Sequence, residues 1–257
     1  MIVDTHCHLN EESFDKDLES VISNLSKNNV CCAYVVGTDK KTSQKAIELA
    51  SSHQNLYAII GLYPEYADQY DQDFEDFLIE NCPNPKVVAI GEIGLDFHGQ
   101  IFDKQTQKIA FARQLQIAKE FDLPVSIHTR EAFQDTFEVL KQNKVFLTGG
   151  SIHCFSGSPE VAREFVKLGF KLGFGGVCTF KNAKNVVKTL QEIDSSCILL
   201  ETDAPYLAPE PYRGTRNEPK NTNIVLQKIA DIKQVDKSML EDQIFKNTKE
   251  TFVRMKI

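Results

Sequence analysis

Residues 1–8 read MIVDTHCH, an apolar run that passes directly into a pair of histidines. Such a run is typical of a buried strand. Side chains two positions apart on a strand point to the same face, so Asp4, His6 and His8 are expected to share one face. Neutral imidazole is a common protein ligand, so the two histidines could hold one divalent ion. Two hydrogen-bonded structural histidines would give the same pattern, and this stretch alone leaves both interpretations open.

The strand pattern recurs seven more times, and helical spacing of apolar residues follows each strand. The expected strands span 30–36, 57–61, 87–92, 124–128, 150–155, 170–174 and 197–203. The expected helices span about 14–25, 46–52, 73–80, 104–121, 131–142, 158–168, 183–191, 223–233 and 236–255. Strands that alternate with helices predict a parallel sheet, and eight such units predict a closed barrel. Because no linker interrupts the pattern, we predict one TIM (β/α)8 barrel domain over 1–257.

Composition narrows the class of protein. A net charge of −7 argues against a protein that coats nucleic acid, but bound metal ions and a few arginines could still attract a phosphate ester locally. No apolar run approaches the roughly 20 residues of a membrane span, and no secretory pattern opens the chain. The seven cysteines form no Cys-x-x-Cys pair. We therefore expect no zinc ribbon, and a reducing, cytoplasmic setting.

Six side chains that can bind metal lie at the ends of the expected strands. They are, in chain order, His6, His8, Glu92, His128, His153 and Asp203. In a barrel of this kind the C-terminal strand ends meet at one mouth, where catalytic groups lie. The remaining histidines, His53 and His98, fall outside the strand ends. The concentration of four histidines on one rim predicts a metal centre.

The donor set is large enough for two divalent ions. Two such ions, roughly 3.5–4 Å apart, need a bridging carboxylate, and Glu92 is the natural candidate. The pair would lower the pKa of a shared water, and Asp203 would bind metal and orient or deprotonate that water. Glu201 and Asp4 are expected to support the ligands from below. Imidazole suits zinc and manganese, while a bridging carboxylate also admits magnesium.

Six motifs, in order, span the chain nearly end to end: DTHCH at 4–8, GEIGLD at 91–96, LPVSIHTR at 123–130, HCFSG at 153–157, ETDAPYL at 201–207 and RGTRNEP at 213–219. In these motifs the chain resembles the TatD family of metal-dependent deoxyribonucleases, among the amidohydrolase-like barrels. The resemblance implies one ion on His6, His8 and Glu92, and a second on His128, His153 and Glu92. It also implies that Asp203 is catalytic and metal-bound.

The same resemblance implies cleavage of phosphodiester bonds in DNA, often from an end, with zinc, manganese or magnesium. DNA or another phosphate-containing molecule is the expected partner, and no obligate protein partner is evident. Family members usually carry Gly-x-His-Pro-His, whose histidines face the substrate phosphate, where this chain reads GLYPE at 61–65. Glu65 makes phosphate binding locally less favourable, while Tyr63 keeps a hydroxyl donor. Hydrolysis of another ester or amide, such as aminoacyl-tRNA deacylation, therefore stays open. A non-catalytic metal-binding protein is the third alternative, which the intact donor set disfavours.

Three arginines are candidates for phosphate contact, because a guanidinium matches phosphate geometry. Arg213 and Arg216 lie in the long loop at 204–221, and Arg130 follows His128. The loop arginines could instead pair with acids such as Glu210 or Glu218, and Arg130 could be a surface residue at a helix start. Asp96 could support the metal site or be a simple loop acid.

Overall fold

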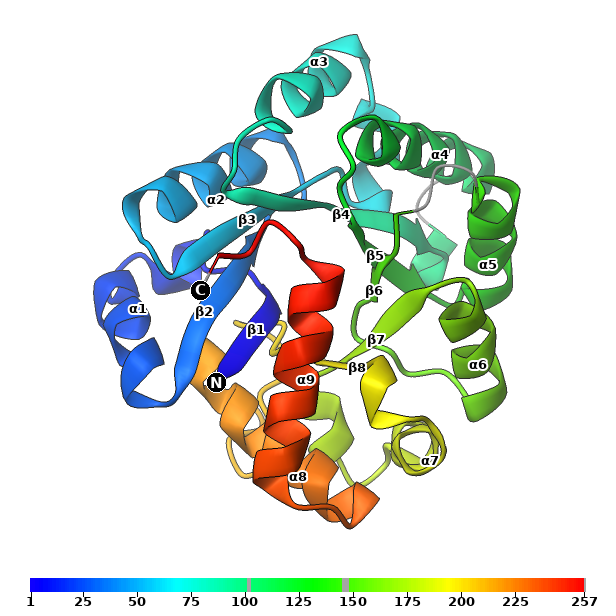
Figure 1. The fold of residues 1–257 in the computed structure, drawn as a ribbon. Coiled ribbons are helices and arrows are strands. Elements are labelled where there is room, and N and C mark those ends of the chain that lie inside the picture. Colours follow the sequence, from blue (N-terminus) through cyan, green and yellow to red (C-terminus); the bar gives the residue numbers. More distant parts are fainter. Residues whose placement is uncertain (101–102, 145–147, 257) are drawn as a thin grey trace.

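A computed structural model describes residues 1–100, 103–144 and 148–256. Eight parallel strands follow one another around a single sheet in the order of the sequence. Their bounds are β1 Ile2–Cys7, β2 Val30–Val36, β3 Leu56–Ile60, β4 Val87–Asp96, β5 Val125–Arg130, β6 Gly150–Ile152, β7 Phe170–Phe174 and β8 Ile198–Leu200. A parallel bridge from Cys7 to Ala204 joins the first strand to the segment after the last. The chain forms the predicted TIM barrel, nearly closed (Figure 1).

Helices connect the strands and cover the outside of the barrel (Figure 1). Their bounds are α1 Leu18–Lys27, α2 Lys40–Ser52, α3 Gln72–Asn81, α4 Lys104–Glu120, α5 Phe133–Gln142, α6 Pro159–Lys167, α7 Lys184–Glu192, α8 Thr222–Lys233 and α9 Lys237–Thr251. The sequence sets several helix starts, because a side-chain oxygen at the N-cap accepts a hydrogen bond from a first-turn amide. The caps of this kind are Asp39, Asp71, Asp103, Ser158 and Asp236.

Several predicted boundaries were wrong, and the backbone shows why. The fourth strand runs past Glu92 to Asp96, because it stays paired with β5 up to Arg130. The sixth and eighth strands are shorter than expected, at three residues each. Cys154 and Asp203, which follow them closely, have positive φ angles of 47° and 58°. This left-handed conformation cannot continue a strand, so it turns the chain toward the barrel mouth.

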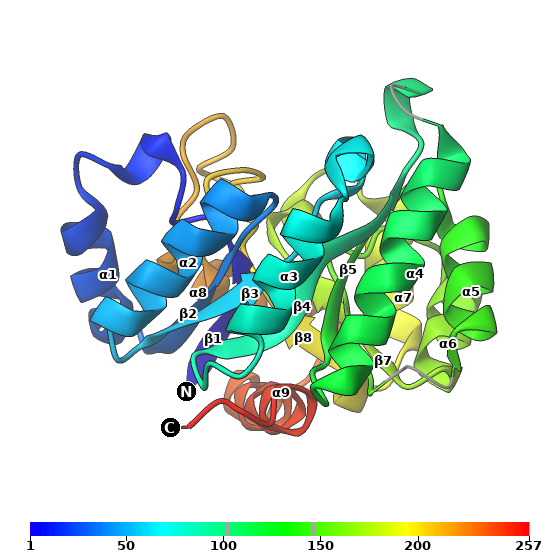
Figure 2. The same cartoon turned by 90° about the horizontal axis from the view of Figure 1, so that it is seen from above.

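The two strand faces pack into two separate cores. Alternate residues of β2, such as Tyr34 and Val35, belong to different clusters of buried side chains. The larger cluster lies between the strands and the helices, and the smaller one includes Phe252 and Met255 from the end of the chain. Helix α9 crosses the end of the barrel where both termini lie (Figure 1), and the loops after the strands lie at the opposite end (Figure 2). None of the described helices is long and apolar enough to cross a membrane.

Candidate metal centre

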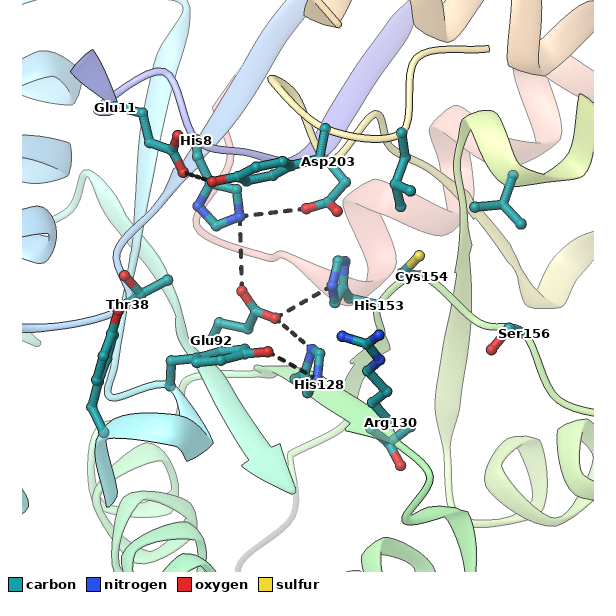
Figure 3. Close-up of a pocket in the computed structure, with 16 residues that line it drawn as sticks. His8, Glu11, Thr38, Glu92, His128, Arg130, His153, Cys154, Ser156 and Asp203 are labelled. Atoms are coloured by element: carbon teal, nitrogen blue, oxygen red, sulfur yellow. Dashed lines mark hydrogen bonds and ion pairs between the residues drawn. The ribbon is translucent and has the colours of Figure 1, made fainter. Parts of the chain in front are cut away.

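The carboxylate of Glu92 lies at the centre of the predicted constellation, in a cavity of about 630 Å³ at the barrel mouth (Figure 3). Its Oε2 is 3.4 Å from His6 Nε2 and 3.8 Å from His8 Nε2. Its Oε1 is 2.8 Å from His128 Nδ1 and 3.3 Å from His153 Nε2. Each carboxylate oxygen therefore faces a different pair of histidines, as a carboxylate that bridges two ions would.

Asp203 joins the pair of histidines from the first strand. Its Oδ1 is 3.4 Å from His8 Nε2 and 3.9 Å from His6 Nε2. Donor atoms of His6, His8 and Asp203 all lie within 4.8 Å of one another, and the same holds for His6, Glu92 and His153. The Asp203 side chain is 15% exposed, against 4% for Glu92, so Asp203 is the carboxylate more open to the cavity.

The distal ring nitrogens of the first two histidines are anchored by neighbouring strands. His8 Nδ1 is 3.1 Å from the carbonyl oxygen of Val36, which can only accept a hydrogen bond. In a neutral imidazole, His8 Nε2 is then left with a lone pair that points at Glu92 and Asp203. His6 Nδ1 lies 3.2 Å from Ser126 Oγ. The partner of each distal nitrogen orients the ring toward the centre of the site.

His128 is held by a carboxylate that the sequence left undecided. His128 Nε2 donates to Asp96 Oδ2 at 2.8 Å, which leaves Nδ1 to face Glu92. The Tyr63 hydroxyl donates to the same Asp96 oxygen at 3.0 Å. Gln107 fixes Asp96 in turn, because its side-chain amide pairs with the backbone N–H and C=O of Asp96 at 2.9 Å each. This arrangement determines which ring nitrogen His128 offers to a metal.

Glu201 supports the remaining histidine from beneath. Its Oε1 is 3.4 Å from His153 Nδ1 and accepts a hydrogen bond of 2.6 Å from the backbone N–H of Cys154. Gly173 leaves the space that this buried carboxylate needs, because a Cβ there would lie 2.1 Å from Glu201 Oε2. Residue 173 can therefore carry no side chain while Glu201 keeps this position.

Asp4 acts on the backbone of the site and not on a histidine ring. It accepts hydrogen bonds from the Thr202 hydroxyl at 2.5 Å and from the Thr202 N–H at 2.9 Å. The Asp203 N–H donates to the carbonyl oxygen of His6 at 2.9 Å. These bonds tie the turn after β8 to β1, and so place Asp203 beside His6 and His8. Burial raises the pKa of Asp4 well above its usual value.

The electrostatics of the centre favour a bound cation. Burial opposes ionisation of Glu92, but the surrounding histidines, His153 and His128 foremost, outweigh burial and hold its pKa well below the usual value. Burial and the neighbouring His153 lower the pKa of His6, which favours its neutral form. His6 Nε2 is buried and has no hydrogen-bond partner among the described residues. Burial lowers the pKa values of His8, His128 and His153, but the neighbouring carboxylates outweigh burial and raise them. A divalent ion would take the place of the protons that these rings hold, and an ionised carboxylate surrounded by imidazoles is a donor set that fits such an ion.

The candidate phosphate-binding residues separate into two groups. Arg130 and Tyr63 line the cavity, although the Tyr63 hydroxyl is engaged with Asp96. Arg213 and Arg216 are not among the described residues that line it. The Arg213 guanidinium lies 4.2 Å from the centre of the Phe180 ring.

Arg216 is engaged in an ion-pair network outside the cavity. Its two terminal nitrogens each lie 2.7 Å from one carboxylate oxygen of Asp17, and Nη2 is 3.3 Å from Glu218 Oε1. The guanidinium also lies over the ring of Phe14. This pairing agrees with the alternative in which the loop arginine pairs with acids and does not contact phosphate. Asp17 is its main partner.

Some contributors to the site were not singled out from the sequence, and the role of Asp96 was left undecided. Ser126 lies two residues before His128, and Asp96 lies four residues after Glu92. An even separation along a strand places side chains on the same face, so this spacing could have indicated both. Glu11, Tyr66 and Tyr206 also line the cavity, but they reach it from segments outside the strands. No periodic pattern marks such positions.

Comparisons with known proteins identify the family of the chain. A family model described as TatD related DNase matches residues 3–253. The chain is 42% identical to the uncharacterized metal-dependent hydrolase YabD of Bacillus subtilis, over 98% of this chain and 99% of YabD. It is 34% identical to the 3'-5' ssDNA/RNA exonuclease TatD of Pantoea ananatis, over 97% of this chain and 98% of that protein. The crystal structure of YJJV, a TatD homolog from Escherichia coli K12, matches with a TM-score of 0.93 at 30% identity, over 98% of each chain. The chain belongs to the TatD family of metal-dependent hydrolases.

Proposed function

We propose that this hydrolase is a deoxyribonuclease that cleaves phosphodiester bonds of DNA from an end, with two divalent metal ions. The observation that carries the proposal is the position of Glu92, whose two oxygens face two separate pairs of histidines. The exonuclease names of relatives such as that of Pantoea ananatis support the choice of substrate.

Each residue of the centre has a distinct role in this proposal. His6, His8 and Asp203 would hold one ion with Glu92 Oε2, and His128 and His153 would hold the other with Glu92 Oε1. Zinc, manganese or magnesium ions there would supply the positive charge that activates a water and stabilises the phosphate oxygens.

The remaining steps fall to side chains of the cavity. Asp203 is more open to the cavity than Glu92, and it would orient the attacking water and accept its proton. Arg130 lines the cavity and would contact the phosphate. Tyr63 would touch the phosphate only if its hydroxyl left Asp96.

The alternative is a hydrolase on another ester or amide, such as aminoacyl-tRNA. The position of Tyr63 favours it, because a hydroxyl already donated to Asp96 is not free to bind phosphate. Glu65 is not among the described residues that line the cavity, so its effect on a bound phosphate would be electrostatic repulsion through space and not direct contact. A panel of DNA, RNA and aminoacyl-tRNA at fixed metal concentration distinguishes the two functions.

The deciding experiment uses purified protein stripped with chelator and reloaded with manganese, magnesium or zinc. End-labelled DNA should shorten from one end, and Glu92→Gln and His128→Ala should each reduce cleavage by orders of magnitude. His53→Gln is the matched control, because His53 lies at the end of α2, away from the cavity. Absence of cleavage with every metal would reject the deoxyribonuclease proposal, as would full activity in both site variants.

We further propose a cytoplasmic setting and one barrel domain over the whole chain. All seven cysteines are free, which suits a reducing compartment. The family model covers 3–253, and the bridge between Cys7 and Ala204 ties the two ends of the sheet together.

A further inference from the structure

Two exposed tyrosine rings stand at the cavity mouth, and none of the proposed roles uses them. Tyr66 is 38% exposed and Tyr206 is 52% exposed, and both line the same cavity as the histidines. A nucleobase is a suitable ligand for exposed aromatic rings beside a phosphate-cleaving site, since every base presents a flat π-face whatever the sequence of the nucleic acid.

The two rings adjoin different residues of the cavity. The Tyr206 ring is 6.2 Å from the His8 ring, in an edge-on arrangement. The Tyr66 ring is 6.2 Å from the Tyr63 ring, which in turn is 4.8 Å from the His128 ring. Tyr206 therefore adjoins the half of the proposed metal pair that contains His8, and Tyr66 is connected through Tyr63 to the half that contains His128, so a phosphate at the centre would be within reach of a different ring from each half.

Both rings are held on anchored backbone. The Tyr206 N–H donates to the carbonyl oxygen of Asp203 at 2.8 Å, and its hydroxyl donates to Glu11 at 2.7 Å. The Tyr66 N–H donates to the carbonyl oxygen of Tyr63 at 2.9 Å. Platforms held in this way lose little conformational entropy when a base stacks on them.

The cavity offers few cations with which to hold a nucleic-acid backbone. Among the described residues that line it, Arg130 is the one lysine or arginine, and three are acids: Glu11, Glu92 and Asp203. A substrate held mainly through its phosphates needs several lysines or arginines. Recognition beyond the phosphate that is cleaved must therefore come from other groups, and the two exposed tyrosine rings are the largest aromatic surfaces that the cavity offers to a base.

Building on the proposed nuclease function, we propose that Tyr66 and Tyr206 are stacking platforms for the bases on either side of the cleaved phosphate. Each ring determines specificity by requiring an unpaired, intact base at its position. Because the ring and not the hydroxyl does the stacking, phenylalanine should replace each tyrosine with little loss, whereas leucine should not.

The kinetic test compares Tyr66→Leu and Tyr206→Leu with the corresponding Phe variants on end-labelled single-stranded DNA. Stacking acts equally on bound substrate and transition state, so each Leu variant should raise KM on the order of tenfold with little change in kcat. The Phe variants should stay within about twofold of wild type. Tyr212→Leu is the matched control, because Tyr212 is 51% exposed and is not among the described residues lining the cavity. Replacing the terminal bases by abasic sites should raise the wild-type KM and leave the Leu variants almost unchanged.

A binding measurement separates this proposal from the nuclease function. The chain contains no tryptophan, so a short DNA with 2-aminopurine at each end can be followed by its fluorescence in chelator, where no cleavage occurs. Quenching that both Leu variants weaken supports the platforms even if no DNA is cleaved. Cleavage by the wild type with equal KM and equal quenching in the Leu variants overturns the platforms and leaves the nuclease function standing.

Discussion

Glu92 is a carboxylate in the middle of a strand whose ten residues are all buried. A buried charge without compensation costs several kcal/mol, so such a position persists only with partners. Its partners here are four imidazoles, two of which have their outer nitrogens held by acceptors, the carbonyl of Val36 and the carboxylate of Asp96. Hydrogen-bond acceptors lie behind these rings, and the Glu92 anion lies between them. A bound cation would therefore balance the charge of the site.

Asp96 is expected to tune metal binding without touching metal. Asp96→Asn removes the charge that orients His128, so affinity for one ion should fall about 10- to 100-fold, as is usual when such a supporting carboxylate is lost. Competition with a chelating dye measures the affinity. Asp122→Asn, at a carboxylate that is 85% exposed, is the control. Unchanged affinity in Asp96→Asn would show that His128 keeps its orientation without Asp96.

Much of the metal site could be predicted from the sequence, because strand ends in a parallel barrel converge. Five of the six donors line one cavity for that reason, and the buried sixth, His6, contacts Glu92 at 3.4 Å. Strand limits were harder to predict, since the turns at Cys154 and Asp203 depend on positive φ angles that no local pattern marks.

The contacts of the loop at 204–221 could not be read from spacing either. Asp17, the main partner of Arg216, is 199 residues away in sequence. Such a pairing depends on how the loop lies against the segment before α1, which is a property of the folded barrel.

The loop and the segment before α1 are held together by Arg216. Arg216→Met should leave KM for DNA almost unchanged and lower Tm slightly, because it removes the Asp17 pair and no cavity contact.

The Arg216 hydrogen bond lowers the pKa of Asp17 below 3.8. A carboxyl group whose pKa is lower in the folded than in the unfolded protein stabilises the fold at pH values above the unfolded pKa. This contribution is lost as the pH falls through the folded pKa. The Tm difference from wild type should therefore be present at pH 7 and disappear as the pH falls through the folded pKa of Asp17. A large increase in KM would instead show that Arg216 binds phosphate.

Metal should stabilise the whole barrel, because the donors come from both ends of the chain. His6 precedes Asp203 by 197 of the 257 residues, and an ion that binds only the folded state links β1 to the turn after β8. At about 1,000 times the Kd, one ion adds about 4 kcal/mol, which corresponds to roughly 10 °C in Tm. Calorimetry with manganese and then with chelator measures the change. Equal Tm values in the two conditions would exclude this linkage.

The acidity of the molecule should show in the salt dependence of catalysis. With a net charge of −7 and Arg130 as the one lysine or arginine among the described cavity-lining residues, few counterions are released on binding. Between 50 and 200 mM salt, KM for single-stranded DNA should rise less than about tenfold, whereas proteins with six to ten phosphate contacts lose about 10³–10⁵ in affinity. A steep slope would reveal a basic surface outside the cavity.

Metal content tests the central claim most directly. Elemental analysis after reloading and desalting should find about two ions per chain in the wild type and in His53→Gln, because Glu92 can bridge a pair. Glu92→Gln should hold fewer, since an amide offers one neutral oxygen in place of two anionic ones. One ion or none in the wild type, or two ions retained in Glu92→Gln, would contradict a centre built around Glu92.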